Sequence, residues 1–177
     1  MSHCLDNPNQ PAWLADARCY YSQIDGASTD PVRVFAAPPG REVGSDNPGI
    51  LCLHLEPRRR LVDVLDANRR ERGVIRSEGI VPGTKWVMRR DGDPVWTLSV
   101  RSIVRRHHVF ESSGERWTFE TPFFWRRQVS GSVAGAPKLL GHVGPTMRLW
   151  FLWVEPGSDT HEVLAAVALM HRTWWRS

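Results

Sequence analysis

The chain has 177 residues, 41% of them hydrophobic and 24% charged, with a formal net charge of +4. This length suits one domain with its own core, and the composition excludes a disordered or fibrous protein. Three cysteines at irregular spacing form neither a disulfide framework nor a zinc pattern. No stretch is apolar for long enough to cross a bilayer, and the first residues lack the pattern of a signal peptide. We therefore expect a cytoplasmic protein with no transmembrane segment. If it associates with a membrane, we expect it to do so peripherally.

The first 49 residues are poor in predicted regular structure. Residues 1–12 are polar and rich in proline and asparagine, so we expect a flexible tail there and a single domain over residues 13–177. Residues 13–22 suit either a turn of helix or a first strand. Glycine and proline punctuate residues 25–49, so that only Val32–Ala36 suits a strand in this region.

From residue 50 onward, short apolar runs alternate with turn signals at regular intervals. Trp96, Leu98 and Val100 alternate with polar residues, which is the period of a half-buried strand. Strands are predicted over residues 50–55, 61–65, 72–76, 85–90, 95–101, 103–110, 116–121, 124–129, 138–143 and 147–154. Such a series is typical of an antiparallel sandwich or barrel.

The end of the chain has a different pattern. Asp159 followed by Glu162 suits the start of a helix, with Asp159 as the N-cap, and every residue from Val163 to Met170 is apolar. A helix that is apolar on every side must be buried on every side, and in an all-β chain the inside of a wide barrel does this. We therefore predict a mostly β fold, a closed antiparallel β-barrel of about twelve short strands around a buried C-terminal helix at about residues 160–173.

This pattern resembles the tubby C-terminal superfamily, which includes tubby proteins, LURP-one-related proteins and phospholipid scramblases. Three segments carry the resemblance: the strand and turn Leu61-Val62-Asp63-Val64-Leu65-Asp66-Ala67, the run Val95-Trp96-Thr97-Leu98 after an Asp-Gly turn, and the apolar helix Val163–Met170. The resemblance covers roughly residues 50–172. It implies a tubby-like barrel and a role in binding membrane lipid or protein. The chain lacks the cysteine cluster, membrane span and acidic calcium loop of scramblases, so scrambling is not expected.

Basic charge is concentrated in the middle of the chain. Residues 57–127 carry sixteen basic and nine acidic residues, whereas residues 1–56 carry three basic and seven acidic ones. Nearly all the basic residues are arginine, which pairs with phosphate and carboxylate groups in a bidentate manner. We expect a basic strand face that binds an anionic partner, either a phospholipid headgroup or an acidic protein surface. Its expected members are Arg89, Arg90, Arg101, Arg105, Arg106, Arg126 and Arg127.

Two other interpretations of the arginines and aromatic residues stay open. The arginines can be separate solvated groups on the outer face of the barrel. Trp125, Trp174 and Trp175 can anchor the protein at a membrane interface, or they can plug the mouth of the barrel around the end of the helix. We expect the other strand tryptophans to lie in the core, and these are Trp86, Trp96, Trp117, Trp150 and Trp153.

The sequence contains no recognisable catalytic, cofactor or metal motif. A nucleophile elbow, a phosphate-binding loop and a zinc-protease motif are all absent. His107 and His108 are neighbours in a predicted strand, so their side chains point to opposite faces and cannot share a metal ion. Nucleic acid is an unexpected partner because no known module is present. The alternatives are a small-ligand carrier of lipocalin type, and an enzyme whose unrecognised site uses His54, His142 or Glu155.

Overall fold

The structure is a computed structural model that describes residues 11–24, 31–36, 49–56, 61–78, 81, 84–102, 107–121, 127–144 and 148–175, except for the side chains of residues 55, 56, 174 and 175. Residues 1–10 of the expected tail lie outside this part of the chain. Residues 13–22 combine both predicted alternatives, because a 3-10 helix, η1 (Ala12–Asp16), leads directly into the first strand. Trp13 Nε1 donates to the backbone oxygen of Pro137 at 2.7 Å and fastens η1 to the barrel.

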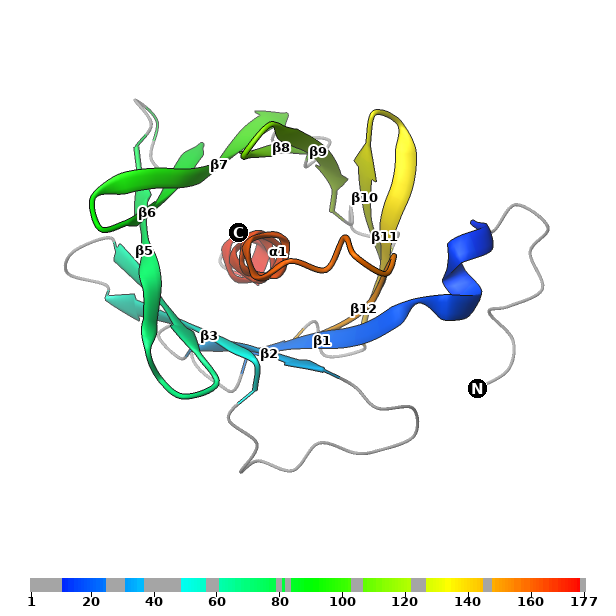
Figure 1. Ribbon diagram of the computed structural model, residues 1–177, viewed down its shortest axis with the longest axis horizontal. Helices are drawn as coiled ribbons and strands as arrows, with labels where there is room; N and C mark the ends of the chain where they lie inside the picture. The colour runs from blue at the N-terminus through cyan, green and yellow to red at the C-terminus, as the bar shows by residue number, and fades with distance from the viewer. Residues whose placement is uncertain are drawn as a thin grey trace.

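The described strands close into an antiparallel barrel of twelve, in which each strand pairs with the next and the last pairs with the first (Figure 1). The strands are β1 (Arg18–Ile24), β2 (Val32–Ala36), β3 (Leu51–Glu56), β4 (Leu61–Asp66), β5 (Glu71–Ser77), β6 (Lys85–Arg90), β7 (Asp93–Ser102), β8 (His107–Ser112), β9 (Glu115–Glu120), β10 (Gln128–Val133), β11 (Ala136–Val143) and β12 (Leu149–Val154). The predicted fold class is therefore confirmed.

Three hairpins in the second half of the barrel use the same two-residue turn. In residues 91–92, 113–114 and 134–135, the first residue has φ between 40° and 52°, and the second is a glycine with φ between 83° and 93°. Positive φ at both positions gives a turn whose twist matches the twist of the flanking strands. The three turns therefore fix the register of β6–β7, β8–β9 and β10–β11.

The barrel has two distinct ends. The hairpin turns after β4, β6, β8 and β10 lie at one end together with residues 155–160, which lead into the helix, and we call this the entry end. At the opposite end, Ser77 pairs with Trp86, Ser102 pairs with His107, and His107 pairs with Glu120. We call this the exit end, because the helix runs toward it.

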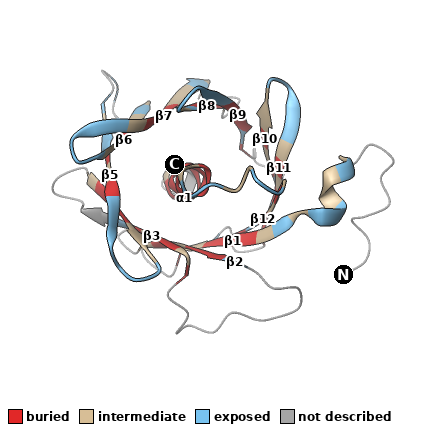
Figure 2. Cartoon of the chain, viewed as in Figure 1, coloured by how far each residue is buried: buried red, intermediate tan, exposed pale blue. Residues whose placement is uncertain are grey.

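The C-terminal helix, α1 (His161–Trp175), runs inside the barrel (Figures 1 and 2). Every residue from Val163 to Met170 is at most 2% exposed, so the prediction of a helix buried on all sides is confirmed. The helix lies closest to β1, β2 and β3. Large rings from β7–β9 extend the core on another side, with Trp96, Phe110, Phe119 and Trp117 in a chain of aromatic contacts.

The start of the helix differs from the predicted start by one residue. Thr160 Oγ1 accepts a hydrogen bond from the Val163 N–H at 3.2 Å, so Thr160, and not Asp159, is the N-cap. Asp159 instead accepts hydrogen bonds from the Arg18 guanidinium at 2.9 Å and from the Tyr20 hydroxyl. Asp159 therefore ties the segment before the helix to β1.

Several strand boundaries in the second half also differ from the prediction. Residues 130–133 were expected in a turn but form the end of β10. Gly131 was the misleading signal, since it marks a close approach and not a turn. A Cβ atom at Gly131 would lie 2.6 Å from the ring of Phe119, so the missing side chain makes room for that ring.

The tryptophan prediction is right in part. Trp96, Trp117 and Trp150 are at most 2% exposed and belong to the core. Trp153 is only half-buried, because its neighbours in β12 occupy the inward positions. Trp86 is also half-buried and packs against the edge of the core. Among the helices of the described chain, none has the length and apolar character needed to span a membrane.

Candidate functional site

The structure separates the predicted basic residues into two groups. Arg89 and Arg90 end β6 at the entry end, whereas Arg101 is near the end of β7 at the exit end. Arg90 pairs with Asp93, eight residues before Arg101, so at about 3.3 Å per residue the two arginines lie roughly 26 Å apart. Arg90 therefore does not share one local surface with Arg101, while the Arg89 side chain reaches Glu78 on the neighbouring strand connection.

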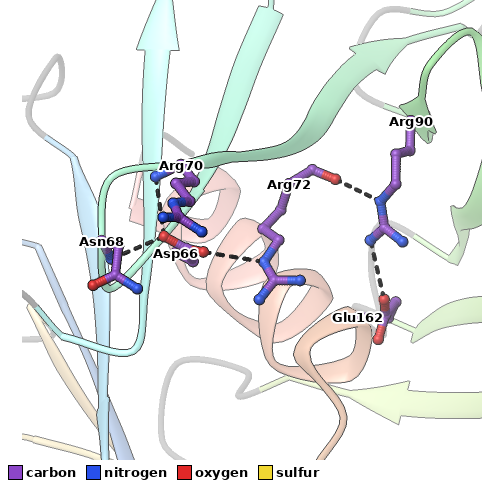
Figure 3. A network of polar contacts seen from close by, with 6 residues as sticks. All are labelled: Asp66, Asn68, Arg70, Arg72, Arg90 and Glu162. Carbon is purple, nitrogen blue, oxygen red and sulfur yellow. Dashed lines mark hydrogen bonds and ion pairs between the residues drawn. The ribbon is translucent and has the colours of Figure 1, made fainter.

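Arg89 and Arg90 are both engaged with neighbouring groups. Arg89 is 3.1 Å from Glu78 and also donates to the backbone oxygen of Gly92. Arg90 donates to the backbone oxygen of Arg72 at 2.9 Å and lies 3.4 Å from Glu162 at the start of α1 (Figure 3). These bonds hold the first turn of the helix to β5 and β6.

Asp66 organises the neighbouring turn at the entry end. Its carboxylate accepts hydrogen bonds from the backbone N–H groups of Asn68 at 2.8 Å and Arg70 at 3.0 Å, and it is 3.4 Å from Arg72 Nε (Figure 3). The bond from Arg70 is the main cause that lowers the pKa of Asp66. Further ion pairs at this end join Arg18 to Asp159, Arg116 to Glu111 and Lys138 to Glu155. Most basic side chains described at the entry end are thus paired with an acid, whereas Arg69 and Arg70, in the turn after β4, are exposed and form no ion pair with the described residues.

The exit end carries a different set of basic residues. Arg101 and Arg127 are exposed there, Arg127 directly before β10. Three more exposed basic residues lie at the exit end, each within two positions of the end of a strand: Arg76, Lys85 and Arg148. We define the exit rim as Arg76, Lys85, Arg101, Arg127 and Arg148.

Little negative charge accompanies the exit rim. Arg76, Lys85, Arg101 and Arg127 form no ion pair with any residue that the structure describes. Three acidic side chains are described within two positions of a strand end here: Glu78, which pairs with Arg89, half-buried Asp63 near the start of β4, and exposed Glu120. The exit rim therefore carries an excess of positive charge.

Four of the predicted site residues, Arg105, Arg106, Trp125 and Arg126, lie outside the described residues. Trp174 and Trp175 are in the last turn of α1, but their side chains are also outside the description. Sequence analysis missed Arg76, Lys85 and Arg148. In a barrel where each strand connects to its neighbour, every second connection lies at the same end. Counting strands would therefore have placed these three residues at the same end as Arg101.

An exposed hydrophobic residue lies at the same end. Val81 is 57% exposed, and its backbone oxygen accepts hydrogen bonds from the N–H of Thr84 at 3.2 Å and from Thr84 Oγ1 at 2.6 Å. The backbone oxygen of Thr84 in turn accepts from the Val100 N–H at 2.8 Å. This ladder fixes Val81 close to Lys85 and Arg101.

The three residues of the alternative enzyme site lie on separate segments of the barrel. His54 and His142 are exposed on separate strands, β3 and β11, and Glu155 is engaged with Lys138 and Ser158. Across the described part of the chain, no three histidine, cysteine or acidic side chains come together as metal ligands.

Two hollows lie at the entry end among the described residues. One is a groove of about 390 Å³ between β7 and the β8–β9 hairpin. The other, of about 80 Å³, lies beside the first turn of α1 and is lined by Arg72, Arg90 and Glu162 among others. The turn signals in the sequence did not reveal the groove.

Comparison with known proteins gives one distant likeness. No protein-family model matches the sequence, and no curated protein matches it. An X-ray structure of a protein from Arabidopsis thaliana has 13% sequence identity and covers 70% of this chain and 90% of its own, with a TM-score of 0.35.

Proposed function

We propose that the protein is a non-enzymatic binding module, a tubby-like barrel whose exit rim binds an anionic partner, with a phospholipid headgroup as the first candidate. The observation that carries the proposal is the contrast between the two ends. Most basic side chains at the entry end are engaged in ion pairs, with Arg69 and Arg70 as exceptions. Four residues of the exit rim are exposed and form no ion pair with the described residues, and these are Arg76, Lys85, Arg101 and Arg127. Five cations around one mouth of a barrel suit an extended anionic surface better than a single point charge.

Val81 favours a membrane over an acidic protein. A hydrophobic side chain that is 57% exposed beside cationic residues can enter the headgroup region while its neighbours contact phosphates. The last turn of α1, which holds Trp174 and Trp175, is directed to the same end. The sequence predicts Arg105, Arg106 and Arg126 as further cations of the basic face, and the proposal keeps them as such.

The strength of such binding can be estimated from the charges. Each basic residue near an anionic leaflet contributes about 1 kcal/mol, so the five residues of the exit rim give about 5 kcal/mol. This corresponds to a dissociation constant in the range of about 0.1–1 mM, which describes reversible peripheral binding. Because the attraction is between exposed charges, salt should weaken it strongly.

Vesicle flotation tests the proposal. The protein should float with vesicles of phosphatidylcholine and phosphatidylserine at low salt, and remain unbound with phosphatidylcholine alone. Arg101→Glu should weaken binding about 30-fold, since it replaces an attraction of about 1 kcal/mol with a similar repulsion. Arg116→Glu, the same charge change at the entry end, is the matched control and should bind as the wild type does.

Three outcomes would count against this function. Equal recovery on neutral and anionic vesicles would remove the electrostatic basis, and equal loss in both variants would remove the role of the exit rim. Retention on immobilised polyglutamate without any vesicle binding would assign the rim to an acidic protein instead.

A further inference from the structure

Buried polar side chains gather at the exit end of the barrel. Apart from tyrosine and tryptophan, the described residues with a buried polar or charged side chain are Ser22, His108, Thr121, His171 and Arg172. Ser22, His108 and Thr121 each lie within two positions of a strand end at this side. His171 and Arg172 are in the last two turns of α1, which runs toward the same end. A buried polar layer therefore lies beneath the exit rim.

His171 is held by two contacts within this layer. Its side chain is 0% exposed, and a hydrogen bond of 2.8 Å joins its Nδ1 to Ser22 Oγ on β1. The imidazole also stacks on Trp150 of β12, with 4.4 Å between the ring centroids and 19° between the ring planes. Both partners are fully buried as well. His171 therefore fastens the end of α1 to the two strands, β1 and β12, whose pairing closes the barrel.

Two further basic side chains belong to the same layer. Arg172 follows His171 on α1 and is 3% exposed. His108 on β8 is buried, and it faces the interior because it pairs with Phe119 of the core. The layer therefore contains basic groups from the helix and from the barrel wall.

No acidic side chain of the described strands faces this layer. At the exit end, Asp63 of β4 and Glu120 of β9 alternate with buried core residues and so point outward. Tyr20, which β1 also turns inward, engages Asp159 at the opposite end of the barrel. The inward positions of the other described strands at the exit end carry uncharged side chains. A positive charge on His171 would therefore meet no opposite charge from these strands.

Burial makes the charged form of His171 costly. A buried cation loses its hydration, and Arg172 already places one positive charge in the same layer. Stacking on Trp150 favours a cation over the ring, but one aromatic face does not replace the lost hydration. Proton uptake by His171 is therefore easier when the end of α1 has left the layer.

We propose that His171 is an acid-sensitive latch, which holds the exit end of α1 inside the barrel and releases it in mildly acidic solution. Because the released state takes up a proton that the closed state does not, the latch is complete well above about pH 6.5, the usual value for histidine, and weakens below it. The released end would carry a charged His171 beside Arg172 at the exit rim. This consequence rests on the proposed function, since the two cations would add to the contact with an anionic membrane.

Hydrogen exchange of the full chain without vesicles tests the latch. After correction for intrinsic rates, protection of the backbone N–H groups in residues 171–175 should fall about tenfold between pH 7.5 and pH 5.5, the effect of one histidine that is charged only in the open state. In His171→Gln, whose amide can still bond to Ser22 but takes up no proton, the fall should be much smaller. His142→Gln, the same substitution at an exposed position, is the matched control and should respond as the wild type does. Equal responses of the wild type and His171→Gln would overturn the proposal.

A measurement on the wild-type chain keeps the test independent of how well the variant folds. In NMR spectra of the histidine side chains at pH 5.5, His171 should be neutral wherever the end of α1 is still protected from exchange. Exposed His142 is the internal reference for an accessible imidazole. A charged His171 in a helix end that remains protected would overturn the proposal.

Vesicles test the link to the membrane separately. At pH 5.5, the wild type should bind vesicles of phosphatidylcholine and phosphatidylserine about fivefold more tightly than His171→Gln, the effect of one additional basic residue near an anionic leaflet. At pH 7.5, the two chains should bind equally. Loss of protection at acid pH with equal vesicle binding by both chains would overturn the link to the membrane while supporting the latch. Absence of vesicle binding by either chain would contradict the proposed function, and the exchange measurement would still decide the latch.

Discussion

Two single residues make specific contacts that hold the barrel together: a glycine that packs against an aromatic ring, and an aspartate that accepts two hydrogen bonds from β1. Gly131 faces the Phe119 ring, and a Cβ atom there would lie 2.6 Å from it. Asp159 accepts hydrogen bonds from Arg18 and Tyr20, and so connects β1 to the segment that leads into the helix. Both residues look unremarkable in the sequence, since a glycine suggests a turn and an aspartate before a helix suggests a cap.

Substitution of Gly131 tests the close approach. Gly131→Ala should lower the free energy of unfolding by about 1–3 kcal/mol, because the new methyl group must displace the Phe119 ring in a filled core. Urea unfolding followed by tryptophan fluorescence measures this change. Ser132→Ala, at the next and outward position, is the control and should change stability by at most about 0.5 kcal/mol. Equal effects of the two substitutions would show that the ring contact is absent.

Tyr20 and Asp159 make the free energy of unfolding depend on pH, Tyr20 at alkaline pH and Asp159 at acidic pH. Burial, together with the hydrogen bond to Asp159, raises the pKa of Tyr20 from 10.0 to about 12. For Asp159, burial acts to raise the pKa, but hydrogen bonds from Tyr20 and Arg18 outweigh it, so the pKa falls below 3.8. The stabilisation from Tyr20 is therefore complete below pH 10 and lost as the pH rises toward 12, whereas that from Asp159 is lost as the pH falls below 3.8.

Tyr20→Phe tests this contact. It should lower the free energy of unfolding by about 1.5–3 kcal/mol at neutral pH, the usual range for a hydrogen bond to a charged group. The difference from the wild type should shrink between pH 10 and pH 12, as measured by urea unfolding at each pH. A difference that stays constant over this range would mean that the Tyr20 hydroxyl does not donate to Asp159.

At the scale of elements, the buried helix packs most closely against β1, β2 and β3. Its apolar residues were predicted to be buried from their unbroken run, and their burial is confirmed at every position from Val163 to Met170. Alternation of apolar residues likewise located most strands, with β6 matching its predicted span. Boundaries failed where glycine marked close packing, as at Gly131. The N-cap shifted by one residue because Tyr20 and Arg18, distant in sequence, engage Asp159.

A truncation within the helix tests its burial. Leu164 is 2% exposed, and Leu164→Ala should lower the free energy of unfolding by about 2–5 kcal/mol through lost contacts and a residual cavity. Phe151→Ala removes a larger side chain, but from an outer position that is 39% exposed, so it should cost much less. A smaller loss for Leu164→Ala than for Phe151→Ala in urea unfolding would contradict the burial of the helix.

At the scale of the whole molecule, the topology sorts charge between the two ends of the barrel. The sequence predicted a basic block over residues 57–127, but it could not show which of those residues lie together. Arg90 and Arg101 are eleven residues apart in sequence and still face opposite ends, because β7 spans the barrel wall between them. The groove lined by β7 and the β8–β9 hairpin was also missed, since the turn signals that mark a hairpin do not show which surface lies hollow beside it.

This charge separation predicts a fixed orientation on an anionic membrane, with the exit rim toward the lipid and the hairpin turns of the entry end in solution. Hydrogen exchange measured by mass spectrometry, with and without vesicles that contain phosphatidylserine, tests the orientation directly. The account predicts slower exchange on vesicles at Val81, at Thr84 and in the segment around Arg127, with no change in the turns at residues 91–92, 113–114 and 134–135. Slower exchange in those three turns, with none around the exit rim, would contradict it.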